Sequence, residues 1–108
     1  MKLRINKEQV LELTIYQKYK LRNWWTPEKY DVVYDSFYEK EGVITTMVDE
    51  LLGETYRINS LPLLNIGQMV MLLHNYGYNT EFLRWQDMDC DNLFELVKIV
   101  LGEEDDEI

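Results

Sequence analysis

Hydrophobic residues recur at steps of three and four along most of the chain, which is the spacing of amphipathic helices. The first such segment begins with Asn6 and Gln9, a pair that fits a helix-capping box. Apolar side chains then follow at steps of four, at Leu11, Ile15 and Tyr19. This pattern predicts one amphipathic helix of four to five turns that ends near residues 22–25.

The next segment, residues 26–46, fits two structures. Thr26-Pro27-Glu28 is typical of a helix start, because Pro suits the first helical position and an acid suits the first turn. Helical spacing continues at Tyr30, Val33, Tyr34 and Phe37, and Gly42 is a candidate stop. The β-branched and aromatic content also suits two strands around Glu41-Gly42. We favour the helix and keep the hairpin as the alternative.

Three further segments have interpretable patterns. Residues 44–52 predict a short helix closed by Gly53, and residues 54–60 a connection. Asn65 is placed to cap a helix that Gly77 closes. Residues 79–86 fit either a helical turn or a short strand.

The last helix has the clearest pattern. Asp89 or Asp91 caps it, and Gly102 ends it. Its apolar stripe is broad and consists of Leu93, Phe94, Leu96, Val97, Val100 and Leu101. The sequence thus predicts a mainly α protein, a compact single domain of about five helices over residues 1–102, with the small β-hairpin as an option. Residues 103–108 form an acidic tail that we expect to be disordered.

Charge narrows the possible partners. The 108 residues carry 11 Lys and Arg against 20 Asp and Glu, a net charge of −9. This acidity disfavours direct binding to nucleic acid phosphates and to anionic membrane surfaces. The charge is uneven, because residues 1–30 carry seven bases and three acids (+4), whereas residues 31–108 carry four bases and 17 acids (−13). An acidic C-terminal face for one partner, or head-to-tail self-association, would use this polarity. The structural alternative is that the basic first helix packs on the acidic half of the same fold.

The predicted location is the cytoplasm. The single cysteine, Cys90, allows no intramolecular disulfide, which fits a reducing compartment. No signal peptide is visible at Met1–Asn6. The longest apolar run, Met69–Leu73, is far shorter than the roughly 18–20 residues of a membrane span.

Residues suited to catalysis or metal binding are sparse. His74 has no nucleophile pattern beside it, and we expect it at the boundary of the core. Cys90 lies between two acids, which raise a thiol pKa. Asp87, Asp89 and Asp91 open a calcium-loop pattern, but Asn92 and Lys98 stand where an EF-hand needs Gly and Glu. We therefore expect no catalytic residue, no metal and no cofactor, and take the acids as charges at a helix start.

Partner binding leaves more candidates. Two adjacent tryptophans cannot easily enter the same core, and exposed Trp is enriched in binding hot spots. The structural alternative is that Trp25 packs on the turn at Pro27 while Trp24 points inward. The candidate partner-binding residues are Trp24, Trp25, Trp85, Asp87, Asp89, Asp91, Glu103, Glu104, Asp105 and Asp106.

Two motifs in the C-terminal half carry a family resemblance. Residues 61–70 read LPLLNIGQMV, and residues 90–101 read CDNLFELVKIVL. They resemble P-x-L-x-I-G-Q-M and C-D-x-L-F-E-x-V-K-x-V-L motifs in small uncharacterised phage and prophage proteins of low-GC Gram-positive bacteria. The resemblance implies a phage or mobile-element accessory protein that acts in the cytoplasm of a bacterial host, and it assigns no functional residue.

These observations favour a non-enzymatic accessory protein that binds and modulates a host or phage protein. One alternative is an acidic DNA mimic that inhibits a nucleic-acid-binding defence enzyme, of the anti-restriction or anti-CRISPR type. Another is a small carboxylate- or metal-dependent enzyme that uses Asp87–Asp91. A DNA-binding regulator that uses the basic first helix is disfavoured by the net charge. Self-association into a homo-oligomer remains open.

Overall fold

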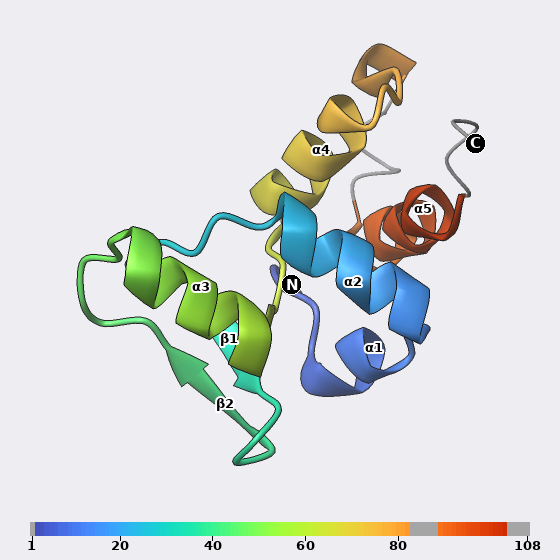
Figure 1. Ribbon diagram of the computed structural model, residues 1–108. Helices are drawn as coiled ribbons and strands as arrows, with labels where there is room; N and C mark the ends of the chain where they lie inside the picture. The colour runs from blue at the N-terminus through green and yellow to red at the C-terminus, as the bar shows by residue number, and fades with distance from the viewer. Residues whose placement is uncertain (1, 83–88, 104–108) are drawn as a thin grey trace. The chain divides into compact units, whose positions relative to one another are not determined.

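Five α-helices and a three-stranded sheet make up the described part of the chain, residues 2–82 and 89–103 of a computed structural model (Figure 1). This confirms the predicted mainly α class with a small β element. In chain order the elements are α1 (Lys7–Leu11), α2 (Ile15–Trp24), β1 (Val32–Asp35), β2 (Lys40–Val43), α3 (Glu50–Asn59), β3 (Ser60–Pro62), α4 (Ile66–Asn75), η1 (Thr80–Phe82) and α5 (Cys90–Gly102).

Contacts divide the chain into two compact units. The helical unit comprises residues 1–5 and 64–108, and the sheet unit comprises Asn6–Leu63. By sequence, the sheet unit carries seven bases and ten acids (−3), and the helical unit four bases and ten acids (−6). The charge is therefore shared more evenly between the units than between the two ends of the sequence. The prediction of one domain over residues 1–102 stays a prediction.

The sheet unit begins with two helices where the sequence predicts one. The capping box at Asn6 and Gln9 is confirmed, with N–H···O distances of 2.9 and 3.1 Å. The helix ends at Leu11, however, because Thr14 and Gln17 form a second capping box that starts α2.

The break changes which side chains are buried. Residues four positions apart lie on one face only within a continuous helix, so the predicted stripe does not continue across the break. The predicted apolar stripe is exposed, at 46% for Leu11, 88% for Ile15 and 61% for Tyr19. The buried residues of this segment are Val10, Leu13, Lys20, Leu21 and Trp25. The prediction of a single amphipathic helix was therefore wrong.

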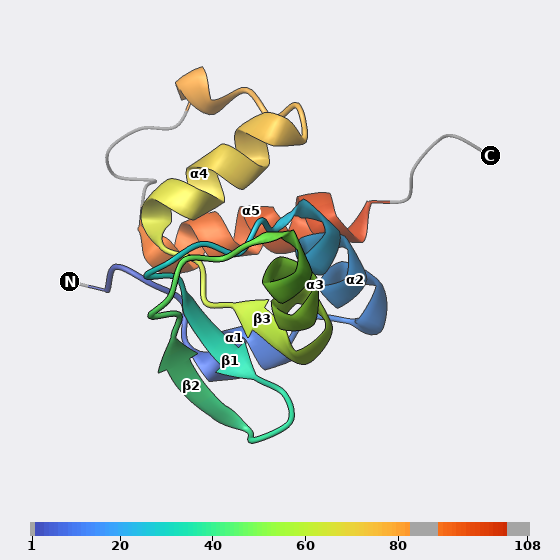
Figure 2. The ribbon, with the colours of Figure 1, turned by 60° about the vertical axis from the view of Figure 1, so that its left-hand side comes forward.

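A β-hairpin replaces the favoured helix at Tyr30–Phe37. β1 and β2 pair antiparallel, with Val33 opposite Gly42, and β1 also pairs with β3, so the strand order is β2-β1-β3 (Figure 2). The hairpin alternative is correct, but its turn lies at residues 36–39 and not around Glu41-Gly42. Tyr30 has φ +77°, which a right-handed helix cannot contain.

The core of the sheet unit favours the strands. Trp25, Val33 and Ile44 form a buried cluster, against which Trp24, Val48 and Tyr56 pack. Val33 enters this cluster from β1, which pairs with β2 on one side and with β3 on the other. Tertiary packing thus overrides the helical spacing of the segment.

The third helix also differs from its prediction. Asp49 caps α3 by accepting the Leu52 N–H at 2.8 Å, and the helix continues through Gly53 to Asn59. Gly53 is therefore a buried helical residue and not a stop, and residues 54–59 are helix and not a connection. Both α2 and α3 contact β3 within the sheet unit.

The helical unit matches its predictions closely. Asn65 and Gln68 form a capping box at the start of α4, and Gly77 has the left-handed φ of +83° that a helix stop uses. Asp89 caps α5, which packs on α4. Residues 79–86 contain the helical turn η1 in their described part. The buried side chains of this unit are Ile5, Leu64, Met69, Leu72, Leu73, Cys90, Leu93, Phe94, Val97, Val100 and Leu101.

Candidate partner-binding surface

The predicted tryptophans lie in different environments. Trp25 is 1% exposed, and its indole Nε1 donates to Asp31 Oδ2 at 3.0 Å. Its ring is buried in the core and its single donor is hydrogen-bonded, so it offers no contact to a partner. Trp24 is half-buried against the same cluster, so the fully inward tryptophan is Trp25. Trp85 lies outside the described residues.

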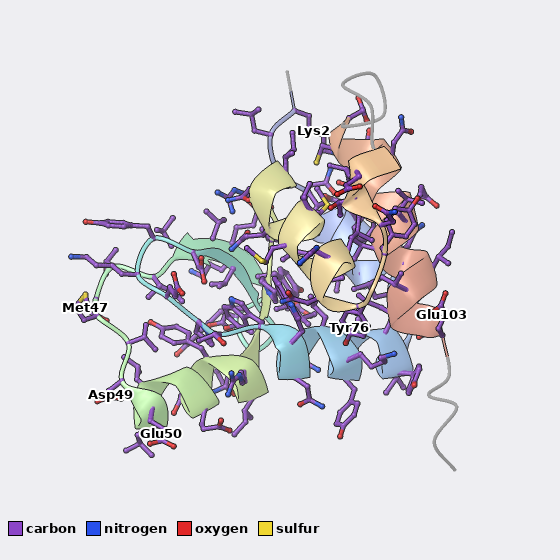
Figure 3. All side chains as sticks on the ribbon, turned by 90° about the horizontal axis from the view of Figure 1, so that it is seen from above. Lys2, Met47, Asp49, Glu50, Tyr76 and Glu103 are labelled. Carbon is purple, nitrogen blue, oxygen red and sulfur yellow. The ribbon has the colours of Figure 1, made fainter. Side chains whose placement is uncertain are left out.

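The predicted acids have structural partners where they are described. Asp89 Oδ1 accepts the N–H groups of Asp91 and Asn92 at 2.8 and 3.3 Å, which confirms its capping role. The Asp91 carboxylate lies 2.7 Å from Lys2 Nζ. Glu103 is exposed at the end of α5, where Figure 3 labels it beside the helix terminus. Asp87, Glu104, Asp105 and Asp106 lie outside the described residues, as does most of the acidic tail.

The residues considered for chemistry are dispersed. Cys90 is buried, and this burial is the main cause that raises the pKa of its thiol; Asp91 and Asp89 raise it further, against Lys2 and Arg4. His74 is exposed in the last turn of α4, and so does not lie at the core boundary as predicted. Within residues 2–82 and 89–103, no group of three or more His, Cys, Asp or Glu side chains could hold a metal ion.

The most exposed apolar side chains of the hairpin lie at its turn. Phe37 and Tyr38 are 78% and 67% exposed, and their rings meet edge to face with centroids 4.9 Å apart. Asp35 Oδ1 accepts the N–H groups of both residues, at 2.8 and 3.0 Å. Glu39 completes the turn with φ +56°. The turn therefore presents two aromatic rings on a hydrogen-bonded backbone.

Strand β2 forms an outer edge of the sheet (Figure 2). All four of its residues are exposed. Ile44 follows β2 directly, and Asp31 precedes β1. The Ile44 N–H points toward the β1 side and donates to the Asp31 carbonyl oxygen at 2.9 Å. In an antiparallel ladder this direction alternates, so Lys40 and Gly42 also face β1. The backbone N–H and C=O groups of Glu41 and Val43 consequently face away from the sheet.

A pocket of about 260 Å³ adjoins this edge. The apolar and aromatic residues of its lining include Val33, Gly42, Ile44, Tyr38 and Tyr56. Three charged residues, Asp35, Lys40 and Glu41, also line it. No atom lies within 4 Å of a Cβ built on Gly42, so its missing side chain leaves room at this position. We call Phe37, Tyr38, β2 and this pocket the hairpin surface.

The hairpin surface was not predicted from the sequence. Asp35-Ser36 is a turn signal between two segments with β-branched residues, and this signal could have located the turn. The helical spacing from Tyr30 to Phe37 concealed it. None of the residues predicted to bind a partner belongs to the hairpin surface.

Comparisons with known proteins give no independent assignment. The chain matches no protein-family model, no curated protein and no solved structure. No helix in the described part of the chain is long and apolar enough to cross a membrane.

Proposed function

We propose that this chain is a non-enzymatic protein-binding module that adds an extended segment of a partner protein to the edge of β2. The observation that carries the proposal is the free edge at Glu41 and Val43, beside a pocket and an aromatic pair. In this mode of recognition, backbone hydrogen bonds supply affinity and pockets for alternate side chains supply specificity.

The chemistry of the partner segment follows from the surface. A strand paired with β2 places alternate side chains on each face of the sheet. The side chain opposite Gly42 would enter the pocket, where an aliphatic group fits the apolar part of the lining. Phe37 and Tyr38 would lose exposed apolar area against the same segment.

The expected affinity is modest. Each new backbone hydrogen bond contributes about 0.5–1.5 kcal/mol net, and burial of an apolar side chain about 1.5–3 kcal/mol. Association itself removes several kcal/mol, so we expect a dissociation constant in roughly the micromolar range. The shortness of β2 and its charged residue Lys40 oppose indiscriminate pairing with other strands.

The family resemblance suggests the biological setting of the proposal. In that setting the module is a phage or mobile-element accessory protein, and its partner is a host or phage protein in the bacterial cytoplasm whose activity it modulates. The proposal involves no catalytic step, metal or cofactor.

The test compares two variants at one position. In Val43→Pro the outward N–H is lost, and an edge strand tolerates Pro there because that N–H makes no bond within the sheet. Val43→Thr retains the N–H and a similar shape. The full chain captures partners from a host lysate, and the affinity of each purified candidate is then measured for all three proteins.

We expect Val43→Pro to bind at least about tenfold more weakly than Val43→Thr, a difference of about 1.4 kcal/mol. Equal affinities would refute binding at the β2 edge. The DNA-mimic alternative predicts a different result, because binding of an acidic surface to a basic cleft weakens steeply with salt. Edge pairing with an apolar side chain in the pocket changes little between low and physiological salt.

A further inference from the structure

A second pocket of the sheet unit lies between α2 and α3 and has a volume of about 360 Å³. We call it the arginine pocket. It is lined by Tyr19, Arg22, Asn23, Glu54, Arg57 and Ile58. It shares no lining residue with the hairpin surface, so an inference about it stands apart from the proposed function.

The two arginines of this pocket differ in what they bind. Arg57 Nε donates to the Trp25 carbonyl at 2.7 Å, and its Nη1 lies 2.8 Å from Glu54 Oε1. It thereby joins α3 to the end of α2 and is paired with an acid. Arg22 is in the last turn of α2, and its Nε is buried without a hydrogen-bond partner among the described residues.

Because Nε is buried, a ligand in the pocket would meet the Nη end of the guanidinium, which has no hydrogen bond or ion pair within the described residues. Burial also lowers the pKa of the Arg22 guanidinium, which stays charged at neutral pH. Two guanidinium groups and one carboxylate line the pocket, so its formal charge is +1. A single negative charge would balance it.

We propose that the arginine pocket binds a carboxylate group, with the Arg22 guanidinium as its main partner. The planar fork of a guanidinium matches the two oxygens of a carboxylate. The Asn23 amide and the Tyr19 hydroxyl are further donors on the pocket wall, and Ile58 offers apolar surface to the stem of a ligand. A phosphate dianion would exceed the balancing charge and meet repulsion from Glu54.

The first experiment uses small probes on the intact chain. Acetate is titrated at constant ionic strength, and the Arg22 Nε–H signal is followed by NMR. Acetamide, an uncharged analogue of acetate, is the matched control. We expect a saturable shift with acetate at a dissociation constant on the order of 10–100 mM, typical of one charged contact in water. Acetamide is expected to cause no saturable shift.

Two variants connect the shift to the guanidinium. Arg22→Met retains an unbranched stem without the charge, and Arg22→Lys retains the charge without the fork. The backbone N–H signals of Asn23 and Ile58 report binding in both. We expect loss of the acetate response in Arg22→Met and at least a threefold weaker response in Arg22→Lys. Because Arg22 Nε makes no bond in the free chain, Arg22→Met should fold with an unchanged or higher Tm.

Further probes identify the source of the carboxylate. The capped peptide acetyl-Ala-Glu-Ala-amide represents an acidic side chain in a protein, and its Gln analogue is the control. We expect the Glu peptide to bind at least as tightly as acetate and the Gln peptide not to bind. Equal shifts with acetate and acetamide, an unchanged acetate response in Arg22→Met, or tighter binding of inorganic phosphate than of acetate would overturn the proposal.

Discussion

Helix α5 and strand β2 are opposite in how their side chains are used. α5 buries six of its residues, among them Leu93, Phe94 and Val97, and packs on α4 within the helical unit. β2 buries none of its four residues and ends the sheet at an edge. Most of the apolar surface of α5 is therefore used in folding, whereas β2 and the adjoining turn leave theirs exposed to a partner.

The same difference holds for aromatic side chains, which are buried in α5 and exposed at the hairpin turn. Phe94 is 1% exposed, and Phe37 is 78% exposed. The same residue type thus contributes to stability in α5 and is available for recognition at the hairpin turn. The apolar stripe of α5 predicts the burial of Phe94, whereas the exposure of Phe37 depends on the hairpin that the folded chain forms.

The largest expected effect is the contrast between Phe94→Ala and Phe37→Ala. The first removes a buried ring and should lower the free energy of unfolding by about 3–5 kcal/mol. The second removes an exposed ring and should change it by less than about 0.5 kcal/mol. Urea denaturation measures both. A loss of more than about 1 kcal/mol in Phe37→Ala would show that the turn is part of a core.

The sequence was informative where the signals are local. The capping boxes at Asn6 and Asn65 and the cap at Asp89 each involve side chains and N–H groups within three residues. The stop at Gly77 is equally local. Such patterns are formed by adjacent residues, so they predict helix ends without knowledge of the rest of the chain.

The hairpin surface could not be predicted in this way, because it depends on pairing between distant residues. Val33 lies opposite both Gly42 and Pro62, which is 29 positions further along the chain. Pro62 has no N–H to donate. It lies at a position of β3 whose backbone groups face away from β1, so the ladder needs no N–H there. The basic N-terminal end meets the acidic half at one point, since Lys2 pairs with Asp91 within the helical unit.

The next contrast concerns two aspartates that accept backbone N–H groups. Asp89→Ala removes the cap of α5 and should cost about 1 kcal/mol of unfolding free energy, with Asp89→Asn as the conservative control. Asp35→Ala should cost less, because water can reach the exposed N–H groups of Phe37 and Tyr38. Its expected effect is on binding, through the loss of the fixed aromatic pair. A larger stability loss in Asp35→Ala than in Asp89→Ala would contradict this assignment.

Two glycines give effects of opposite sign. Gly42→Val should raise the unfolding free energy by about 0.5–1 kcal/mol, since it places a β-branched residue in a strand with space for it. Gly77→Ala should lower it by about 1 kcal/mol, because φ +83° strains any residue with a Cβ. Thermal denaturation checks both signs.

Gly42→Val also tests the pocket beside β2. Its side chain would occupy part of the space left for a partner's side chain, so we expect weaker partner binding together with higher stability. Binding that is unaffected by this substitution would place the partner's side chains elsewhere. Gly77→Ala, in the other unit, should leave the affinity for partner unchanged.

The smallest effect concerns the one thiol, Cys90 in α5. Burial raises its pKa, so the folded protein holds the thiol proton at pH values where the unfolded chain has lost it. The folded state then binds more protons than the unfolded state, and stability should fall as pH rises above the ordinary thiol value of about 8.5. Cys90→Ala should remove this part of the slope.

The reactivity of the Cys90 thiol can be compared with that of a thiol introduced into the hairpin surface. At neutral pH a disulfide reagent should react slowly with Cys90, because the thiol is 2% exposed and its raised pKa leaves little thiolate. In Tyr38→Cys, made in the Cys90→Ala background, the new thiol lies at a position that is 67% exposed and should react at least tenfold faster. If Cys90 reacted as fast as the thiol in Tyr38→Cys, α5 would open often enough to expose its core face. The contrast between a buried helix face and an exposed strand edge would then be lost.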